Sequence, residues 1–466
     1  MGRIWAVAKS VLIEFVRLRS LLAFVLLVLG SCTAGLAVWL HLGAGRGDEK
    51  IQTFLSYSLG FSMAILSLLT IFLSVGTVTR DIKRREIFLV AVKPVSRGEF
   101  LAGKFAGVAL LDLLLLGAVG AAVYGGARVM QRTEPVTEDE RSRVRELVLI
   151  ARRSVEPVLV GVSEQDLQEE VRREAERLIE EETGRLENPT GQELAVMRRT
   201  ITETVYNQMA LQRRAVLPGR HVTWHFTGIR PSAAAGGRVY VRYKQNASPP
   251  VGDLAVMGLW HYGDDPAVPF TKPPLVRVEE AGAVHEFAVP VGELSPAGEL
   301  YVAYQNAAEN YPITMVFPLP KEGEVSIEAL YVAGGFEANL LRGLGAIYLR
   351  LAFLALLGTT MGAWLSLPVA VLLVLVVFGL GISSQFIDDA LKWQGVQATT
   401  AFNRTIMALV PRLAAYDPAP ALEKGRYVAF GMLARAFGVM VVLQGGLAGL
   451  AGYAIFRFRE LARVTV

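Results

Sequence analysis

The chain has 466 residues, of which 52% are hydrophobic and only 19% are charged, and its formal net charge is +4. About a quarter of the residues in a soluble globular protein are charged, and the mean hydropathy of this chain is +0.39. These values exclude a soluble enzyme and a disordered chain, and a lone cysteine, Cys32, excludes a secreted disulfide scaffold. We therefore expect an integral membrane protein.

Residues 1–20 place apolar side chains at helical spacing, with basic residues between them, which predicts a helix lying in the membrane interface. The uncharged run from 20 to 45 then predicts a first membrane span at 21–42. The basic, polar stretch before this run is too long for a cleavable signal peptide. We expect the span to be retained.

Five further spans are predicted at 53–78, 105–127, 343–363, 366–386 and 434–456. As one helix, the apolar stretch 351–387 would be roughly 55 Å long, far more than one crossing needs. Glycine, serine and proline residues near its middle instead predict a hairpin of two spans. These residues are Gly358, Gly362, Ser366 and Pro368.

The basic residues beside the spans predict the orientation of the chain. Four precede the first span, seven lie between the second and third, and three follow the sixth. Six spans put these segments on one side, so both termini are expected in the cytoplasm and residues 128–341 outside it, in the cell inner (plasma) membrane. Segment 386–430 conflicts with this orientation, because it carries five basic residues although it is expected on the extracytoplasmic side.

The predicted extracytoplasmic insertion has two parts. Segment 128–219 is highly charged and predicts an amphipathic helical region with a break at Asn188-Pro189. The apolar residues at helical spacing are Val160, Leu167, Val171, Ala175, Leu178 and Ile179. In segment 220–341, apolar and polar residues alternate with period two, which predicts an antiparallel β-sandwich. The expected fold class is a membrane α-helical six-span bundle, residues 1–127 and 342–466, carrying this inserted domain.

The most informative motif lies in the short, basic cytoplasmic loop 79–104. Glu86 and an apolar run precede Pro94, Ser96 and Arg97, and Gly103 with Lys104 then opens the next span. This arrangement resembles the permease subunits of type-2 ABC exporters, as do the N-terminal helix, segment 410–418 and the basic tail after 456. The resemblance covers 1–127 and 342–466. It implies that the loop, through these six residues, couples to a separate ATP-binding subunit; the alternative is a loop that only sets topology.

The same loop contains an incomplete phosphate-binding motif. Gly98 and Gly103-Lys104 have the right spacing, but Phe105 replaces the hydroxyl residue that would hold magnesium, and no strand precedes the motif. We therefore expect no nucleotide binding, no cofactor and no enzymatic activity in this chain. ATP and magnesium would bind to the partner subunit.

Three ionisable residues are expected within spans: Asp112, Arg350 and Arg435. Charged groups inside a membrane usually have a partner or face a wet cavity. Asp112 is interpreted either as a pathway residue that pairs with Arg350 or Arg435, or as a structural carboxylate near the cytoplasmic interface.

The extracytoplasmic segment offers weaker candidates. His221 and His225 are four residues apart in a predicted strand without a third ligand, which favours structural residues over a metal site. Seven aromatic residues are assigned to the sandwich core, with a carbohydrate-binding surface as the alternative. They are Trp224, Tyr240, Tyr243, Trp260, Tyr262, Tyr301 and Tyr304. The charged helices are either a partner-binding arm or a solvated pair.

These patterns lead to one favoured function and one alternative. The favoured function is the permease half of an ATP-driven exporter, assembled as a homodimer with two ATPase subunits. The alternative is a non-transporting anchor that transmits force through 128–341 to an extracytoplasmic protein or polysaccharide. A membrane enzyme would need a convergent acid, base or metal cluster, and a nucleic-acid partner would need a motif that the sequence lacks.

Overall fold

The computed structural model describes residues 2–17, 30, 47–84, 96–133, 137–185, 190–231, 237–250, 255–267, 271–307, 313–319, 326–387 and 411–458. The chain divides into two compact units. The first, here called the helical unit, comprises Met1–Ala151 and Gly335–Val466, and the second, the β unit, comprises Arg152–Gly334.

Four described helices in the helical unit are long and apolar enough to cross a membrane. They are α3 (Gly47–Lys83), α5 (Arg97–Thr133), α10 (Phe336–Gly362) and the continuous helix Phe430–Phe458, which is made of α15 (Phe430–Ala436), the π-helical η4 (Phe437–Gly445) and α16 (Gly446–Phe458). These helices and the separate β-sheet region are compatible with the predicted membrane helical protein that carries a β domain. Helix α11 (Leu367–Ile382) is apolar but shorter, and the predicted span 21–42 lies, except for residue 30, outside the described residues.

The predicted hairpin is present at the expected place. Helix α10 ends at Gly362 and α11 begins at Leu367, with Pro368 in its first turn, where a missing N–H costs no hydrogen bond. Residues 388–410 lie outside the described residues; η3 (Ala414–Tyr416) and α14 (Ala419–Glu423) follow them, and α14 packs against α3.

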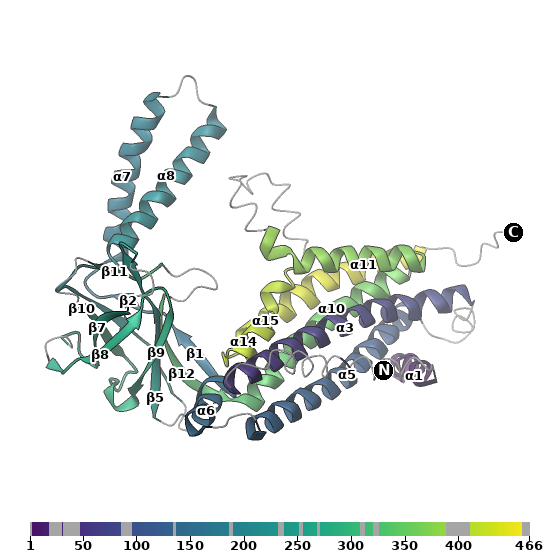
Figure 1. Cartoon of the computed structure of the whole chain (residues 1–466). Helices are drawn as coiled ribbons and strands as arrows, with labels where there is room; N and C mark the ends of the chain where they lie inside the picture. The colour runs from purple at the N-terminus through teal and green to yellow at the C-terminus, as the bar shows by residue number, and fades with distance from the viewer. Residues whose placement is uncertain are drawn as a thin grey trace. The chain divides into compact units, whose positions relative to one another are not determined.

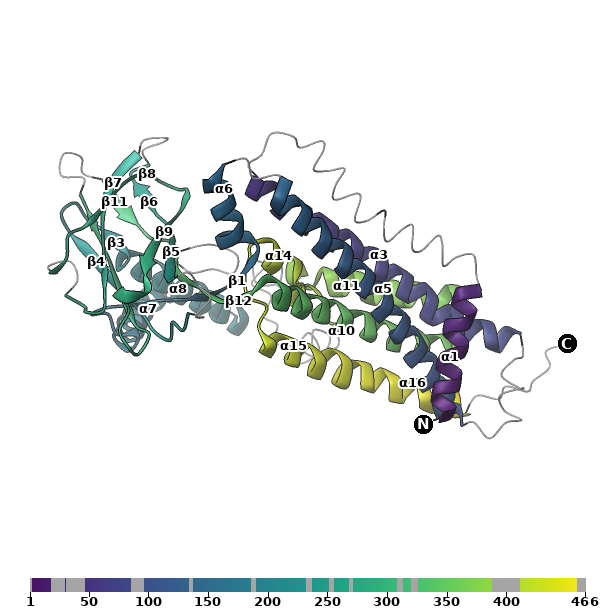
Figure 2. The ribbon, with the colours of Figure 1, turned by 90° about the horizontal axis from the view of Figure 1, so that it is seen from below.

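The core of the helical unit lies where α10 packs against α3 and α5, while α1 (Gly2–Arg17) packs against α5 (Figure 2). Buried apolar side chains such as Leu55, Val108 and Leu351 fill the core. Small residues permit the close crossing of α3 and α10, because a Cβ atom at Gly358 would lie only 1.9 Å from Ser74 Oγ. Two short helices, α6 (Glu138–Arg143) and the π-helical η1 (Val144–Val148), pack at α3.

The described residues of the β unit form three sheets (Figure 1). A four-stranded sheet has the order β1-β12-β5-β9 and a five-stranded sheet the order β2-β4-β10-β7-β8. A small third sheet has the order β3-β11-β6. The strands are β1 (Ile150–Val155), β2 (Val158–Leu159), β3 (Ala215–Val216), β4 (His221–Phe226), β5 (Arg238–Lys244), β6 (Asn246–Ser248), β7 (Ala255–Gly263), β8 (Leu275–Glu280), β9 (Val284–Pro290), β10 (Leu300–Asn306), β11 (Thr314–Val316) and β12 (Ile327–Gly335). A single-turn 3-10 helix, η2 (Val291–Glu293), follows β9.

The two larger sheets pack face to face, as the period-two pattern predicts. Trp260 of β7 lies 4.2 Å, centroid to centroid, from Tyr243 of β5 and 5.2 Å from Phe287 of β9. Antiparallel register places alternate residues of each strand in this interface, for example Val302 opposite Trp224. The sandwich-like β unit therefore has its own aromatic core.

The charged segment forms a helical hairpin, α7 (Glu164–Arg185) and α8 (Gly191–Gln212), which lie side by side (Figure 1). A capping box starts α8: Glu193 N–H donates to the Thr190 hydroxyl, and the Thr190 N–H donates to the Glu193 carboxylate. The Thr190 hydroxyl also donates to the Glu193 carboxylate, and these two hydrogen bonds, from the Thr190 N–H and hydroxyl, lower the pKa of the Glu193 carboxyl. The break at 188–189 lies outside the described residues.

The predicted helical region 128–219 also contains strands, which is a correction. Strands β1 and β2 precede α7 and occupy edges of the two larger sheets. Val160, assigned above to the helix face, lies in the turn after β2. The strands were missed because they depend on tertiary contacts. β1 pairs with β12, a strand far along the chain, and such long-range pairing is not visible in the local spacing of apolar residues.

Candidate functional site

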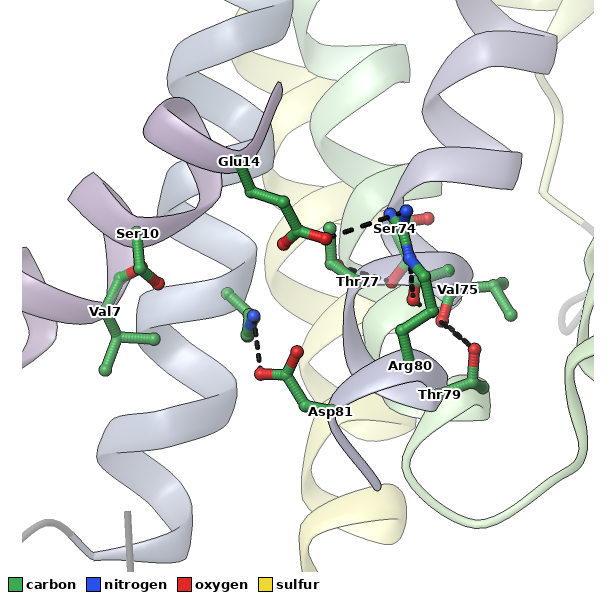
Figure 3. A network of polar contacts seen from close by, with 11 residues as sticks. Val7, Ser10, Glu14, Ser74, Val75, Thr77, Thr79, Arg80 and Asp81 are labelled. Carbon is green, nitrogen blue, oxygen red and sulfur yellow. Dashed lines mark hydrogen bonds and ion pairs between the residues drawn. The ribbon is translucent and has the colours of Figure 1, made fainter. Parts of the chain in front are cut away.

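The described ends of the predicted coupling loop meet in a cluster of charged residues, here called the charged junction. It consists of Glu14 on α1, Arg80 and Asp81 at the end of α3, and Arg97 and Lys104 at the start of α5. Figure 3 shows Glu14 of α1 pointing toward Arg80 of α3, while the Asp81 carboxylate points away from that pair. The junction therefore lies where the chain enters and leaves the loop.

The strongest contact in the charged junction is the ion pair between Lys104 and Asp81. Lys104 Nζ lies 2.7 Å from Asp81 Oδ2, and the two side chains are 3% and 13% exposed. Lys104 Nζ also lies 5.7 Å from the ring centroid of Phe100. Because a buried ammonium group requires a charged partner, this pair fixes the end of α3 against the first turns of α5.

A weaker ion pair connects α3 to α1. Arg80 Nη1 lies 3.6 Å from Glu14 Oε1, with both side chains about one-third exposed, and Arg80 Nε donates to the Gly76 carbonyl at 3.0 Å. Exposed pairs of this kind contribute about 0–1 kcal/mol. The Arg80 pair therefore orients α1 more than it stabilises the bundle.

Arg97 connects the beginning of α5 to the end of α16. Its Nη1 donates to the carbonyls of Phe456 at 2.6 Å and Arg457 at 3.0 Å, and its guanidinium carbon lies 5.6 Å from the Phe456 ring centroid. The last carbonyls of a helix lack intrahelical donors, so a cation there is favourable. Ser96, also predicted for the loop, caps α5, with its hydroxyl accepting from Glu99 N–H.

Gly103, predicted as a coupling residue, has a packing role. A Cβ atom at this position would lie 2.5 Å from Val7 Cβ and 3.0 Å from the Ile4 carbonyl of α1. One helical turn later, Gly107 meets Val11 in the same way. Only glycine permits α1 to pack this closely on α5. The two remaining coupling candidates, residues 86 and 94, lie outside the described residues.

The predicted intramembrane charges do not pair as proposed. Asp112 accepts a hydrogen bond from Thr70 Oγ1 at 2.9 Å, which connects α5 to α3. Arg350 Nη1 instead lies 3.2 Å from Met63 Sδ, and Arg435 is exposed at the end of α15. The pairing of Asp112 with an arginine is therefore corrected: the packing of α3 on α5 places the Thr70 hydroxyl beside one carboxylate oxygen, and the other, Oδ2, is buried without a hydrogen bond among the described residues.

The aromatic residues of the β unit are mainly core. Trp224, Tyr243, Trp260 and Tyr304 are fully buried, while Tyr240 is 9% exposed. Burial raises the pKa of the Tyr243 phenol above its usual range, so its hydroxyl stays protonated and donates to Glu279. Only Tyr262 and Tyr301 among the seven candidates are partly exposed, too few for the proposed carbohydrate surface.

The histidines form no metal site among the residues that the structure describes. In that part of the chain, no group of three or more His, Cys, Asp or Glu side chains is placed to hold a metal ion. His225 stacks on Tyr301 with centroids 4.2 Å apart, and its Nε2 lies 3.8 Å from Glu299 Oε1. Both are ordinary cross-strand contacts of β4 and its neighbourhood.

Sequence reasoning missed a buried charge network on the four-stranded sheet. Glu286 accepts from Arg152 Nη1 and from Arg242 Nε, each at 2.9 Å, and Ser154 donates to Glu328 at 2.5 Å. Arg152 is only 2% exposed, and burial lowers the pKa of its guanidinium. Alternation in β5 places Arg242 between Glu286 and Glu328, but only the sheet order reveals this.

A groove of about 750 Å³ lies between α7 and α8. Its floor is apolar, with Val171, Ala175 and Ile179, and its rim carries charged groups such as Arg172 and Glu203. The ion pairs of α7 lie mostly within the helix at i,i+3 and i,i+4 spacing, for example Arg172 with Glu169. This pattern suits a solvated helical pair and leaves the groove open as a partner surface.

The chain matches no protein-family model, no curated protein and no solved structure. Its function is therefore inferred from its own residues and geometry.

Proposed function

We propose that the chain is the permease subunit of an ATP-binding-cassette transporter and works in the direction of export. In this proposal six spans form one half of the membrane pathway, with the span at 21–42 and α11 added to the four long helices. A second copy supplies the other half, and separate subunits bind ATP and magnesium and dock on loop 79–104. Both termini are cytoplasmic, and 128–341 is extracytoplasmic.

The observation that supports coupling most strongly is the buried Lys104–Asp81 pair. A docking loop transmits work only if its ends are attached to the moving helices, because nucleotide can shift the bundle only through differential contacts. Lys104 and Asp81 join α5 to α3 at 2.7 Å, and Arg97 joins α5 to α16. A push on the loop would therefore reach three helices at once.

The test compares ATPase association and coupled hydrolysis for variants of the charged junction. Lys104→Ala should uncouple hydrolysis, while the charge swap Lys104→Asp with Asp81→Lys should restore part of it, because the pair is rebuilt. Arg435→Gln, which changes an exposed arginine on α15, is the matched control. Full coupled activity in Lys104→Ala would contradict a coupling role and leave the loop with a role in membrane topology only.

Arg97 provides a second arm of the same test. Arg97→Ala should weaken ATPase association, and Arg97→Lys should rescue it only in part, because lysine keeps the charge but loses the planar guanidinium that lies over the Phe456 ring. Normal membrane insertion of both variants is the required control. Wild-type association and hydrolysis in Arg97→Ala would contradict its role.

Topology is tested by a reporter that is active only outside the cytoplasm. A fusion near Gly191, at the start of α8, should be active, and one after Arg84 should be inactive. The reverse result would invert the proposed orientation and remove loop 79–104 from the ATPase side.

The alternative, a force-transmitting anchor, is favoured by one connection. Strand β12 ends at Gly335 and α10 begins at Phe336, so the β unit continues into a membrane helix without intervening residues. The α7–α8 groove would then bind the extracytoplasmic partner. ATP-dependent uptake of cargo into inverted vesicles supports the permease; ATPase activity that responds to an extracytoplasmic protein without any cargo flux supports the anchor.

A further inference from the structure

A small cavity lies inside the helical unit between α3, α10, α11 and segment 411–418. Its volume is about 200 Å³. Two charged residues, Arg350 and Asp417, line it together with an otherwise apolar wall. The apolar lining residues are Met63, Ala64, Leu68, Phe378, Ile382 and Ala414.

Arg350 makes no direct ion pair or hydrogen bond with an anionic side chain among the described residues, although the Asp417 carboxylate lies near enough to interact with it electrostatically. The side chain is 7% exposed, and its Nε is buried without a hydrogen-bond partner. Its remaining described contacts are with uncharged groups: Nη1 lies 3.2 Å from Met63 Sδ, and the guanidinium carbon lies 5.2 Å from the Phe378 ring centroid. These contacts hold the guanidinium in place but do not neutralise it, and a buried charge normally requires a charged acceptor.

Asp417 lines the same cavity and acts on Arg350 as a nearby negative charge, but no direct ion pair joins the two side chains in the described part of the chain. Its Oδ1 accepts from the Ala419 N–H at 2.9 Å, which holds the carboxylate at the start of α14. A fixed cation and a fixed anion therefore face one apolar cavity without contacting each other. The ligand that complements both carries a negative and a positive group side by side.

We propose that this cavity binds the headgroup of a zwitterionic membrane amphiphile, with its phosphate on Arg350 and its ammonium group on Asp417. A guanidinium binds phosphate through two parallel hydrogen bonds. The volume suits a headgroup and excludes a whole lipid. Leu68 and Ile382, which are 41% and 46% exposed at the cavity wall, give the acyl chain an apolar surface on α3 and α11.

The experiment measures binding to the full-length purified chain by native mass spectrometry with three probes. Lysophosphatidylethanolamine carries both charges and a tail, lysophosphatidic acid lacks the ammonium group, and free phosphoethanolamine lacks the tail. The wild type should bind lysophosphatidylethanolamine most tightly. Tighter binding of free phosphoethanolamine would assign the cavity to a soluble zwitterion and overturn the membrane source.

Three substitutions locate the binding. Arg350→Gln should raise the Kd for lysophosphatidylethanolamine by about 10-fold to 100-fold, the usual contribution of hydrogen bonds to a charged group. Asp417→Asn keeps an acceptor for Ala419 and should remove the preference over lysophosphatidic acid. Arg435→Gln, on an exposed arginine, should leave all three affinities unchanged.

A photoreactive lysophosphatidylethanolamine keeps the test decisive if Arg350→Gln does not fold. In the wild type it should label peptides containing 63–68 or 378–382, and unlabelled lipid should compete. Labelling elsewhere, wild-type binding by Arg350→Gln, or equal binding of an uncharged monoacylglycerol would each refute the proposal. In the last case the apolar wall binds the acyl chain and the two charged residues contribute nothing to recognition.

Discussion

The Lys104–Asp81 pair is expected to dominate the stability of the charged junction. Asp81→Asn removes the carboxylate from a pair whose lysine is 3% exposed, leaving the ammonium group buried without its counterion. Breaking a buried pair in this way costs about 3–5 kcal/mol. Glu14→Gln breaks the Arg80 pair instead, whose side chains are 33% and 31% exposed, and should cost only about 0–1 kcal/mol.

A double replacement separates the cost of an unpaired charge from the net contribution of the pair. Lys104→Met together with Asp81→Leu removes both charges and keeps similar volume, so its stability should return close to that of the wild type. The assay is denaturant unfolding of the full chain in detergent micelles, followed by tryptophan fluorescence. If Asp81→Asn costs no more than Glu14→Gln, or if the double variant is as unstable as Asp81→Asn, the ion-pair reasoning is wrong.

Three other predictions concern packing. Gly358→Leu should prevent folding of the bundle, because even a Cβ atom would lie 1.9 Å from Ser74 Oγ. Gly117→Ala is the control and should be tolerated, because a Cβ atom there has no neighbour within 4 Å. Size-exclusion profiles of both variants test this prediction. Residues 152–334, expressed alone, should fold as a soluble unit with strands and a helical hairpin, and a circular dichroism spectrum without a strand contribution would contradict this. Within that unit, Trp260→Ala should cost about 3–5 kcal/mol of unfolding free energy in urea, and a loss below about 1 kcal/mol would show that the aromatic core is misassigned.

Local patterns predict much of the fold. Predominantly apolar runs of sufficient length predict α3, α5 and α10, since a membrane span needs about 20 apolar residues. Pro368 and its neighbouring glycines predict the break before α11. Period-two alternation predicts strands such as β5, where Val239 and Val241 point into the core.

Contacts between distant segments could not be predicted in the same way. The edge position of β1 depends on β12, far along the chain. Arg97 was expected to contact an ATPase, and its hydrogen bonds to Phe456 and Arg457 depend on how two helix ends meet. Thr70 is one of several hydroxyl residues on α3, and only the packing of α3 on α5 selects it as the partner of Asp112. Residue spacing predicts which face of a helix or strand is buried, but the contacts between side chains of distant segments depend on tertiary packing.

Site-specific photo-crosslinking in native membranes tests the central proposal most directly. A photoreactive amino acid replaces Lys83, an exposed residue at the loop end of α3, and in a control chain it replaces Val129, which is 61% exposed near the opposite end of α5. The permease proposal predicts that Lys83, and not Val129, crosslinks to an ATP-binding subunit, identified by its sequence and its ATP hydrolysis. Crosslinking of that subunit at both positions, or at neither, would contradict coupling through loop 79–104.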